Sequence, residues 1–397
     1  MAHFGSPQNA PDPDGGWSEE IKVVKNAVIV PPRVSSMIQP AGVLDGEGNY
    51  VPHGALWRKH RPITTIPEMP EEINRERKGR WLWGGVLWVH FGHFLVESSS
   101  RLWALDQMKD ELDGVIFVPK RPNKGTRLYG YHKDFIHLMA PGIDIRIAAQ
   151  PNRIEELVVP GQGFGIGRIT RGTEAFRSAF RSSFGKHVKP EGSKKLYISR
   201  SALGLRKGGL LGEEKLEEYL RAEGYDIFHP EQHAMSEQVA RYKAAEQVIG
   251  ADGSALHLFS MVGRPEQKVA IISRRKSRAQ QYLVENVEHF CGAAPLNIQE
   301  LKREWVRVIG DKTAPSRSSH GEMDLPKIGA VLEAEGFVSS AGHWENLSDA
   351  ELQSLFQGKD NPEGVTFKPV EKEDPAERAR IKEMRVARRA AAASKVA

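Results

Sequence analysis

The segment from residue 194 to 261 constrains the fold most, because short apolar runs alternate in it with amphipathic stretches of helical period. The expected strands are 196–199, 225–228 and 247–249, and the expected helices are 213–223 and 236–246, the second with Ser236 as its N-cap. Strands that alternate with helices across short connections form a parallel sheet. Ligands of such sheets bind beyond the carboxyl ends of the strands.

Polar residues follow two of these expected strands. Arg200 comes directly after 196–199, and the turn Gly250-Ala251-Asp252-Gly253-Ser254 follows 247–249 and leads into the apolar segment 255–261. Both lie at carboxyl ends of strands, so the sequence predicts a ligand site there. A purely structural interpretation also fits: Arg200 pairs with Glu213 or Glu214, the glycines make a tight turn, and Asp252 caps the next helix.

A second stretch with chemical content runs from residue 81 to 105. A strand is expected near 86–89, and from Phe91 onward the apolar residues follow a helical period. His93, Glu97 and Arg101 are spaced i, i+4, i+8 and fall on one side of that expected helix. A carboxylate one turn from an imidazole raises its basicity, as a general base requires, and Arg101 would hold Glu97. The alternative is a solvated charge ladder, and His90 fits a structural role.

Composition limits the class of protein. The 397 residues suffice for two domains and a tail, and the net charge of +5 suits an anionic small ligand or a membrane surface better than nucleic acid. Cys291 is the only cysteine, which excludes an intramolecular disulfide and suits a reducing compartment. The polar, proline-rich N-terminus does not resemble a secretory signal, and no apolar run is long enough to span a bilayer. We expect a soluble cytoplasmic protein, with peripheral membrane association as an option.

The chain divides into four predicted parts. Residues 1–20 are expected to be disordered, 21–184 to form an N-terminal α/β domain, 194–312 a C-terminal α/β domain, and 313–397 a mostly helical appendage with a basic tail. Residues 58–80 and 311–325 are expected to be loops. The tail favours an exposed solvated helix over contact with an anionic membrane. The glycines of 161–167 lack the Gly-Lys-Ser/Thr of a phosphate loop.

Together, and in this order, the two stretches resemble glycosyltransferase family 61, which includes bacterial capsule and surface-polysaccharide enzymes. The first motif is His90-Phe91-Gly92-His93-Phe94-Leu95-Val96-Glu97, closed by Arg101-Leu102-Trp103. The second comprises Tyr197-Ile198-Ser199-Arg200, Glu213-Glu214-Lys215-Leu216, Ser236-Glu237-Gln238 and the turn 250–255. The resemblance covers roughly residues 80–262. Asp252 stands where the family often has histidine, and Ser99 replaces a bulkier residue.

The resemblance implies two Rossmann-like domains that face a cleft in a GT-B-like arrangement, and inverting transfer of a sugar from a nucleotide-sugar donor to a glycan or other hydroxyl acceptor. Such an enzyme would need no metal and no cofactor besides the donor, and would act in cell-surface polysaccharide synthesis. His93 and Glu97 are then the catalytic pair. The expected donor-binding residues are Arg200, Lys207, Glu237, Gly250, Asp252, Gly253 and Ser254, with phosphate held by cations and by the amides of residues 253–255.

Two other functions compete with this one. A non-catalytic polysaccharide-binding protein of the same fold would use tryptophans such as Trp81, Trp83, Trp88 and Trp103 to stack on sugars, although core packing is their commoner use. A hydrolase ranks third, because the sequence contains no Gly-x-Ser-x-Gly and Asp252-Gly253-Ser254 is no nucleophile elbow. Binding of a nucleotide separates the transferase from the binding protein.

Overall fold

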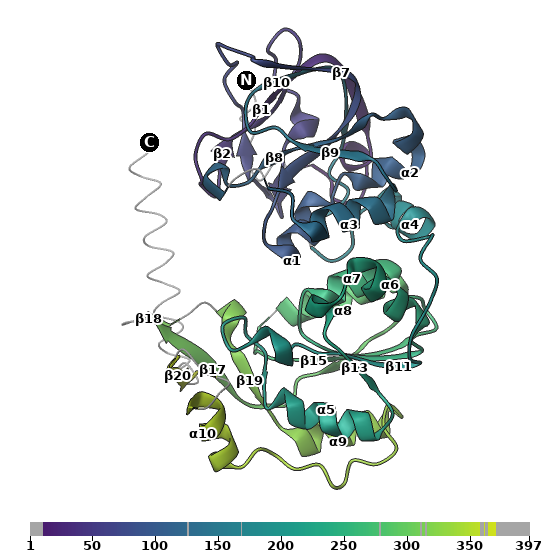
Figure 1. The fold of residues 1–397 in the computed structure, drawn as a ribbon, viewed down its shortest axis with the longest axis vertical. Coiled ribbons are helices and arrows are strands. Elements are labelled where there is room, and N and C mark those ends of the chain that lie inside the picture. Colours follow the sequence, from purple (N-terminus) through teal and green to yellow (C-terminus); the bar gives the residue numbers. More distant parts are fainter. Residues whose placement is uncertain are drawn as a thin grey trace.

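The computed structural model describes residues 11–124, 127–167, 169–277, 279–309, 312–313, 316–357, 361 and 364–370. They form two α/β units, one above the other in Figure 1, joined by the segment after α4 (Glu174–Ser183). The α/β class predicted from the sequence is confirmed. No helix among the described residues is long and apolar enough to cross a membrane. The basic tail from residue 375 onward lies outside the described residues.

The prediction that residues 1–20 are disordered is wrong for the described residues 11–20. They contain the short helix η2 (Gly16–Ser18), and Ser18 is fully buried. The neighbouring Glu19 carboxylate accepts a hydrogen bond from the amide of Ala175 (3.0 Å), in the first turn of α4. This segment is therefore fixed to the first unit by burial and by capping of a helix.

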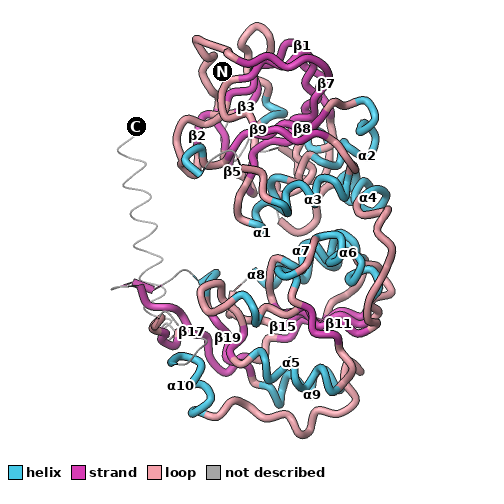
Figure 2. Tube along the Cα trace, in the orientation of Figure 1, coloured by secondary structure: helices cyan, strands magenta, loops and turns pink. Residues whose placement is uncertain are grey.

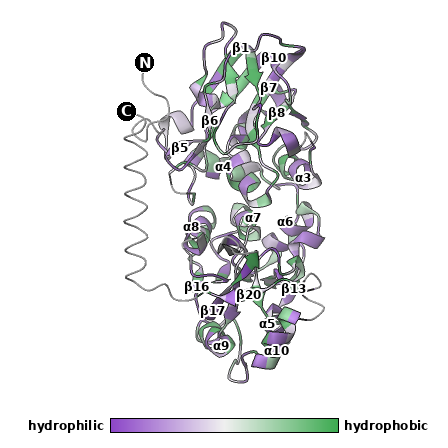
Figure 3. Cartoon of the chain, turned by 90° about the vertical axis from the view of Figure 1, so that its left-hand side faces the viewer, coloured by the Kyte–Doolittle hydropathy of each residue, from purple (hydrophilic) through white to green (hydrophobic). Residues whose placement is uncertain are grey.

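The first unit is built on a mixed six-stranded sheet in the order β3-β1-β10-β7-β8-β9. Strands β10, β7, β8 and β9 are parallel, whereas β1 is antiparallel to β10 and to β3. In Figure 3 hydrophobic colour follows the strands around β1 and β10. The strands are β1 (Ile21–Val30), β3 (Gly42–Leu44), β7 (Arg75–Leu87), β8 (Gly114–Pro119), β9 (Asp144–Ile147) and β10 (Asn152–Pro160).

The order of the parallel strands places a switch point between β7 and β10. Strand β8 follows β7 on one side, whereas β10, the last in sequence, lies on the other side of β7. Ligand sites form at the carboxyl ends of strands at such points. The prediction of a loop over residues 58–80 is wrong for residues 75–80, because β7 begins at Arg75. Arg80 of β7 pairs with Glu156 (2.6 Å) and with Glu111, and these ion pairs offset the positive charge of the strand.

The second unit carries the parallel sheet predicted from residues 194–261. Its order is β13-β11-β14-β15-β16, and every neighbouring pair is parallel. Strand β11 lies beside β14 with Ile198 opposite Gly250, so the residues that follow these two strands meet at the switch point. The strands are β11 (Lys195–Ile198), β13 (Asp226–Phe228), β14 (Gln247–Ala251), β15 (Lys268–Ile272) and β16 (Leu296–Ile298).

Helices cover both faces of this sheet, as Figure 2 shows. The helices α6 (Met235–Ala244), α7 (Ala255–Val262) and α8 (Ala279–Cys291) face the first unit, and α5 (Glu213–Ala222) and α9 (Leu325–Ala334) lie on the other side. The α6 N-cap is Ala234 and not Ser236, which corrects the prediction; α6 begins at Met235, so Ser236 already lies inside the helix.

The residues after 312 are joined to the second unit. In α9, Leu325, Ile328 and Leu332 pack in one core with Tyr197 and Ile249 of the sheet. The predicted boundary between residues 312 and 313 therefore crosses a continuous core. A small sheet in the order β12-β19-β17-β18, with β20 beside β17, lies next to it. Its strands are β12 (Leu210–Leu211), β17 (Leu301–Ile309), β18 (Lys312–Thr313), β19 (His320–Met323) and β20 (Phe367–Pro369), and β19 replaces part of the loop expected over 311–325.

The two units share one hydrophobic core through the helices between them. Phe290 of α8 lies with its ring centroid 5.4 Å from that of Phe164 and 5.9 Å from that of Phe176, and both of those belong to the first unit. Asn286 of α8 also donates a hydrogen bond to the carbonyl oxygen of Thr170 (3.0 Å). This packing fixes how the units face each other.

We predict that the chain unfolds in one cooperative thermal transition, and that Phe290→Ala destabilises it by about 3–5 kcal/mol and separates the unfolding of the two units. Differential scanning calorimetry measures both effects. The matched control is Phe135→Ala, since the aromatic rings that Phe135 contacts among the described residues, Phe94, Phe180 and Phe184, all belong to the first unit; it should lower stability and keep a single transition. Two transitions in the unaltered protein would contradict a shared core.

Candidate functional site

The segment after β7 is not the regular helix predicted from residue 91. It begins with α1 (Phe91–His93), continues as a π-helical turn, η4 (Phe94–Ser98), and leads to the short helix η5 (Leu102–Ala104). The amide of Ser99 bonds to the carbonyl oxygen of Phe94, five residues back (3.1 Å). This wider turn keeps His93 next to Glu97 and turns Arg101 away from them. Such turns often occur at functional sites.

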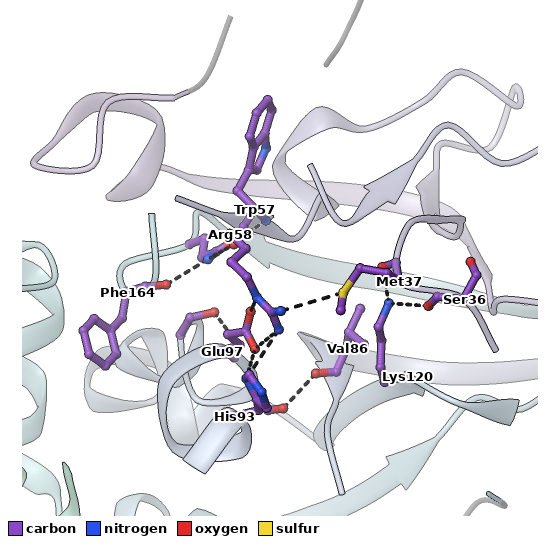
Figure 4. A network of polar contacts seen from close by, with 12 residues as sticks. Ser36, Met37, Trp57, Arg58, Val86, His93, Glu97, Lys120 and Phe164 are labelled. Carbon is purple, nitrogen blue, oxygen red and sulfur yellow. Dashed lines mark hydrogen bonds and ion pairs between the residues drawn. The ribbon is translucent and has the colours of Figure 1, made fainter. Parts of the chain in front are cut away.

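Arg58 holds Glu97, so the prediction that Arg101 does so is wrong. The Arg58 guanidinium makes a fork to the Glu97 carboxylate, with Nε–Oε1 at 2.6 Å and Nη2–Oε2 at 2.7 Å. His93 Nδ1 lies 2.8 Å from Glu97 Oε2 (Figure 4). Glu97 is buried, which by itself raises its pKa, but the hydrogen bonds from His93 and Arg58 outweigh burial and hold the pKa below its usual value.

This geometry assigns the protons of His93. Because Nδ1 faces an ionised carboxylate, we assign the hydrogen to Nδ1, which leaves Nε2 as the acceptor nitrogen. The His93 side chain is 43% exposed, although its Nδ1 faces the buried Glu97. Glu97 thus fixes the tautomer and the orientation that a general base needs.

Arg58 lies at the end of the segment 53–58, whose backbone is held in place by hydrogen bonds. Arg101 is fully buried and donates to the carbonyl oxygens of His53 (2.9 Å) and Ala55 (2.5 Å), and its burial lowers its pKa to about 9. Gln162, after β10, exchanges two hydrogen bonds of 2.8 Å with the backbone of Trp57. Residues 53–58 are thereby fixed at the switch point between β7 and β10. Arg101 contributes to the site through the backbone that carries Arg58.

Trp88 forms the wall behind this group. Its ring is stacked on His93 with centroids 4.7 Å apart, and the cations of Arg58 and Lys120 lie 5.0 and 5.3 Å from its centroid. Burial lowers the pKa of Lys120 to about 8, and its Nζ donates to the carbonyl oxygens of Ser36 and Met37 (3.0 and 2.6 Å). The suggestion that the tryptophans stack on sugars is wrong for those named, since all four are buried in the core: Trp81, Trp83, Trp88 and Trp103.

The second half of the site follows β11. The Arg200 guanidinium passes directly over Gly253, where a Cβ atom would overlap its Nη1. Its Nη2 donates to the carbonyl oxygen of Gly208 (3.0 Å), and Nε has no partner among the described residues. Glu213 contacts the Arg200 backbone amide (Oε1, 2.8 Å), so the predicted side-chain salt bridge is replaced by a contact to the main chain. Gly253 is therefore needed for close approach and does more than make a turn.

Asp252 is held within the protein frame. Its carboxylate pairs with Arg275 (2.9 and 3.4 Å), and its carbonyl oxygen accepts Arg274 Nε (2.9 Å). The residue at the N-cap of α7 is Ser254, so the capping interpretation of Asp252 is wrong. Arg274 and Arg275 follow β15 as Arg200 follows β11. The sequence analysis did not predict Arg274 and Arg275 as site residues, although they follow the apolar run 268–272 in the same way.

The two halves of the site face each other between the units. A Cβ atom on Gly92 would lie 2.7 Å from Ser254 Oγ, so α1 touches the turn before α7. The pKa of His90 is lowered by burial and by the charges of His93, Lys207 and Arg317, which places Lys207 near this contact. Glu237, predicted to face the cleft, pairs instead with His233 (2.9 Å) and Arg241 (3.6 Å) on its own helix and loop.

A cavity of about 770 Å³ opens beside Arg275 at the carboxyl ends of β15 and β16. Lys59 of the first unit reaches its rim, with Nζ 3.4 Å from the hydroxyl of Tyr282. The lining residues are Ser273, Arg275, Lys276, Ser277, Gln280, Gln281, Tyr282, Glu285, Gln299 and Leu301. Amide, hydroxyl and aromatic groups of this kind suit a polar ligand with a flat face.

Comparison with known proteins supports a glycosyltransferase. Residues 91–270 match the family model Glycosyltransferase 61, and this range contains His93, Glu97, Arg200, Lys207 and the turn at 252–254 but neither Arg58 nor Arg275. No curated protein matches the sequence. A solved structure described as the dodecameric iron-containing heptosyltransferase TibC in complex with ADP-D-beta-D-heptose aligns with 70% of this chain and 82% of its own, at 10% identity and a TM-score of 0.29. A likeness that low carries no inference.

We predict a pH-dependent contribution of Glu213 to stability. Burial raises its pKa to about 7, against hydrogen bonds from the Arg200 amide and the Tyr197 hydroxyl that lower it. A raised carboxyl pKa favours the folded state at low pH, and this contribution is lost as pH rises from about 4.5 to 7, by on the order of 3 kcal/mol. Glu213→Gln removes the titration, so its free energy of unfolding relative to the unaltered protein should increase by that amount between pH 4.5 and 8. Denaturant unfolding at several pH values measures the difference; a constant difference would contradict the prediction.

Proposed function

We propose that this protein is an inverting glycosyltransferase that moves a sugar from a nucleotide-sugar donor to a hydroxyl group of a glycan or other acceptor. The contact between Gly92 and Ser254 carries the proposal, because it brings the His93 pair and the Arg200 turn into one site. The match of residues 91–270 to glycosyltransferase family 61 supports it. We further propose that the two units work as a GT-B-type pair in cytoplasmic synthesis of cell-surface polysaccharide.

His93 acts as the base in this scheme. Its Nε2 takes the proton of the acceptor hydroxyl while that oxygen forms a bond to the anomeric carbon of the donor and the bond to the leaving phosphate breaks. A single displacement of this kind inverts the anomeric configuration. Glu97 stabilises the imidazolium that forms, and Arg58 keeps Glu97 ionised and in place. Arg58 is a positioning residue, since it acts through Glu97 and through its contact with His93, whose Nδ1 lies 3.3 Å from Arg58 Nη2.

Cations and backbone amides stabilise the leaving nucleoside diphosphate. The Arg200 guanidinium lies against Gly253, beside the start of α7, and Lys207 is exposed on the loop after β11. The amides of Leu256 and His257 already bond to the carbonyl oxygens of Gly253 and Ser254, so those of residues 253–255 are the ones aimed at phosphate. Arg275 is paired with Asp252 and lines the cavity beside β15, where we place the nucleoside.

The first experiment is calorimetric binding of UDP, GDP, CMP and dTDP, with and without EDTA. We expect one of them to bind, and Arg200→Ala to weaken it by about tenfold or more, because a charge-assisted hydrogen bond to phosphate contributes roughly 1.5–3 kcal/mol. Binding that EDTA leaves unchanged is expected, since we propose metal-independent transfer. Arg206→Ala, on the same loop, is the matched control and should retain affinity. No binding at millimolar nucleotide would overturn the donor site.

The second experiment separates chemistry from binding. With the nucleotide sugar that this screen selects, His93→Ala should lower the rate of transfer, or of donor hydrolysis, by about 10²–10⁴-fold, because proton removal by a placed base contributes that much. Its affinity for the nucleotide should stay within about twofold. His60→Ala, an exposed histidine of the same unit, controls for the substitution. Equal rates for His93→Ala and the unaltered enzyme would exclude His93 as the base.

The polysaccharide-binding alternative loses its main sequence argument, because the tryptophans named for it are buried. It predicts no nucleotide binding and no effect of Arg200→Ala. The same calorimetric titration therefore decides between the two functions.

A further inference from the structure

Aliphatic side chains are concentrated on the surface that borders the base. Among the described residues, nine large hydrophobic side chains are exposed, and four of them belong to two loops beside Trp88 and Lys120. The exposed fractions are 60% for Val34, 47% for Met37, 44% for Ile38 and 43% for Val89. Single exposed apolar residues are ordinary, whereas a cluster of them next to a polar site indicates a contact surface.

Hydrogen bonds join the loops that carry these side chains. Lys120 Nζ donates to the carbonyl oxygens of Ser36 and Met37, and the Lys120 amide donates to the carbonyl oxygen of Leu87 (3.0 Å), two residues before Val89. Arg58 Nη1 lies 3.7 Å from Met37 Sδ, which connects the loop to the Glu97 pair (Figure 4). The backbone of loop 33–38 is thus fixed, and its apolar side chains stay exposed although the loop is ordered.

The charge of this surface has one sign. The segments 33–41, 87–93 and 119–123 contain Arg33, Lys120 and Arg121 and no aspartate or glutamate. Arg33 and Arg121 are exposed. We name this surface the docking patch and define it by Arg33, Val34, Met37, Ile38, Val89 and Arg121.

We propose that the docking patch binds the surface of a bilayer that contains anionic lipid. Aliphatic side chains enter the boundary between headgroups and acyl chains, and flanking arginines contribute about 1 kcal/mol each near a negative membrane surface. The combination of both signals gives useful affinity where either alone is weak. Docking in this way directs the surface next to His93 toward the membrane, so an acceptor at the membrane surface reaches the base. The docking itself does not depend on the proposed function.

The test is flotation of the full chain with vesicles of phosphatidylcholine alone and with one quarter phosphatidylglycerol. We expect binding to the anionic vesicles, weakened by 0.5 M salt, and little binding to the neutral ones. Met37→Ser/Ile38→Ser should lower the partition coefficient by about tenfold or more, since it removes two apolar side chains from the contact. Arg33→Gln/Arg121→Gln should lower it on anionic vesicles only.

The matched control is Val23→Ser, because Val23 is exposed (47%) between Lys22 and Lys25 near the start of β1, and it is the other end of this strand that leads into loop 33–38. It should bind as the unaltered protein does. Each variant should keep the thermal unfolding and the nucleotide binding of the unaltered protein, which shows that it is folded. A variant that loses only vesicle binding has then lost the contact between the docking patch and the membrane. Absence of binding to anionic vesicles, or equal binding by Met37→Ser/Ile38→Ser, would overturn the proposal.

Discussion

The buried carboxylate of Glu97 is the constraint on which the first half of the site depends. An ionised carboxylate removed from water costs several kcal/mol unless charged hydrogen bonds replace its hydration. Arg58 and His93 supply these bonds at 2.6–2.8 Å. The position of Arg58 depends in turn on backbone that Arg101 and Gln162 hold. Burial of one charge thus orders the loop at 53–58, the π-helical turn and the base together.

The second half of the site depends on a close approach of Arg200 to the backbone as well as on a buried ion pair. Arg200 lies against Gly253, and its main chain is anchored by Glu213, whose carboxyl is itself bonded to Tyr197 (2.8 Å). Asp252 and Arg275 neutralise each other beside it. Arg200, whose guanidinium donates to a backbone carbonyl oxygen, is the cation that we assign to phosphate. Arginines that pair with a carboxylate, such as Arg275, hold the backbone of the site in place.

The sequence predicted what depends on local pattern and missed what depends on distant contacts. Alternation of strand and helix over 194–261 was enough to place Arg200 and Ser254 at neighbouring strand ends, because the strand order of a parallel sheet brings such ends together. The i, i+4 spacing found His93 with Glu97. Arg58 lies 39 residues before Glu97, so no spacing indicates it. The π-helical turn that removes Arg101 has no sequence pattern of its own, since its apolar residues follow the ordinary helical period.

The shared core explains why two half-sites from separate units can act as one. Because Phe290 packs against Phe164 and Phe176, the distance between α1 and the turn before α7 is set by close-packed aromatic rings and is not left to a flexible linker. A substrate that enters between Gly92 and Ser254 must therefore displace side chains or separate the units slightly at that edge.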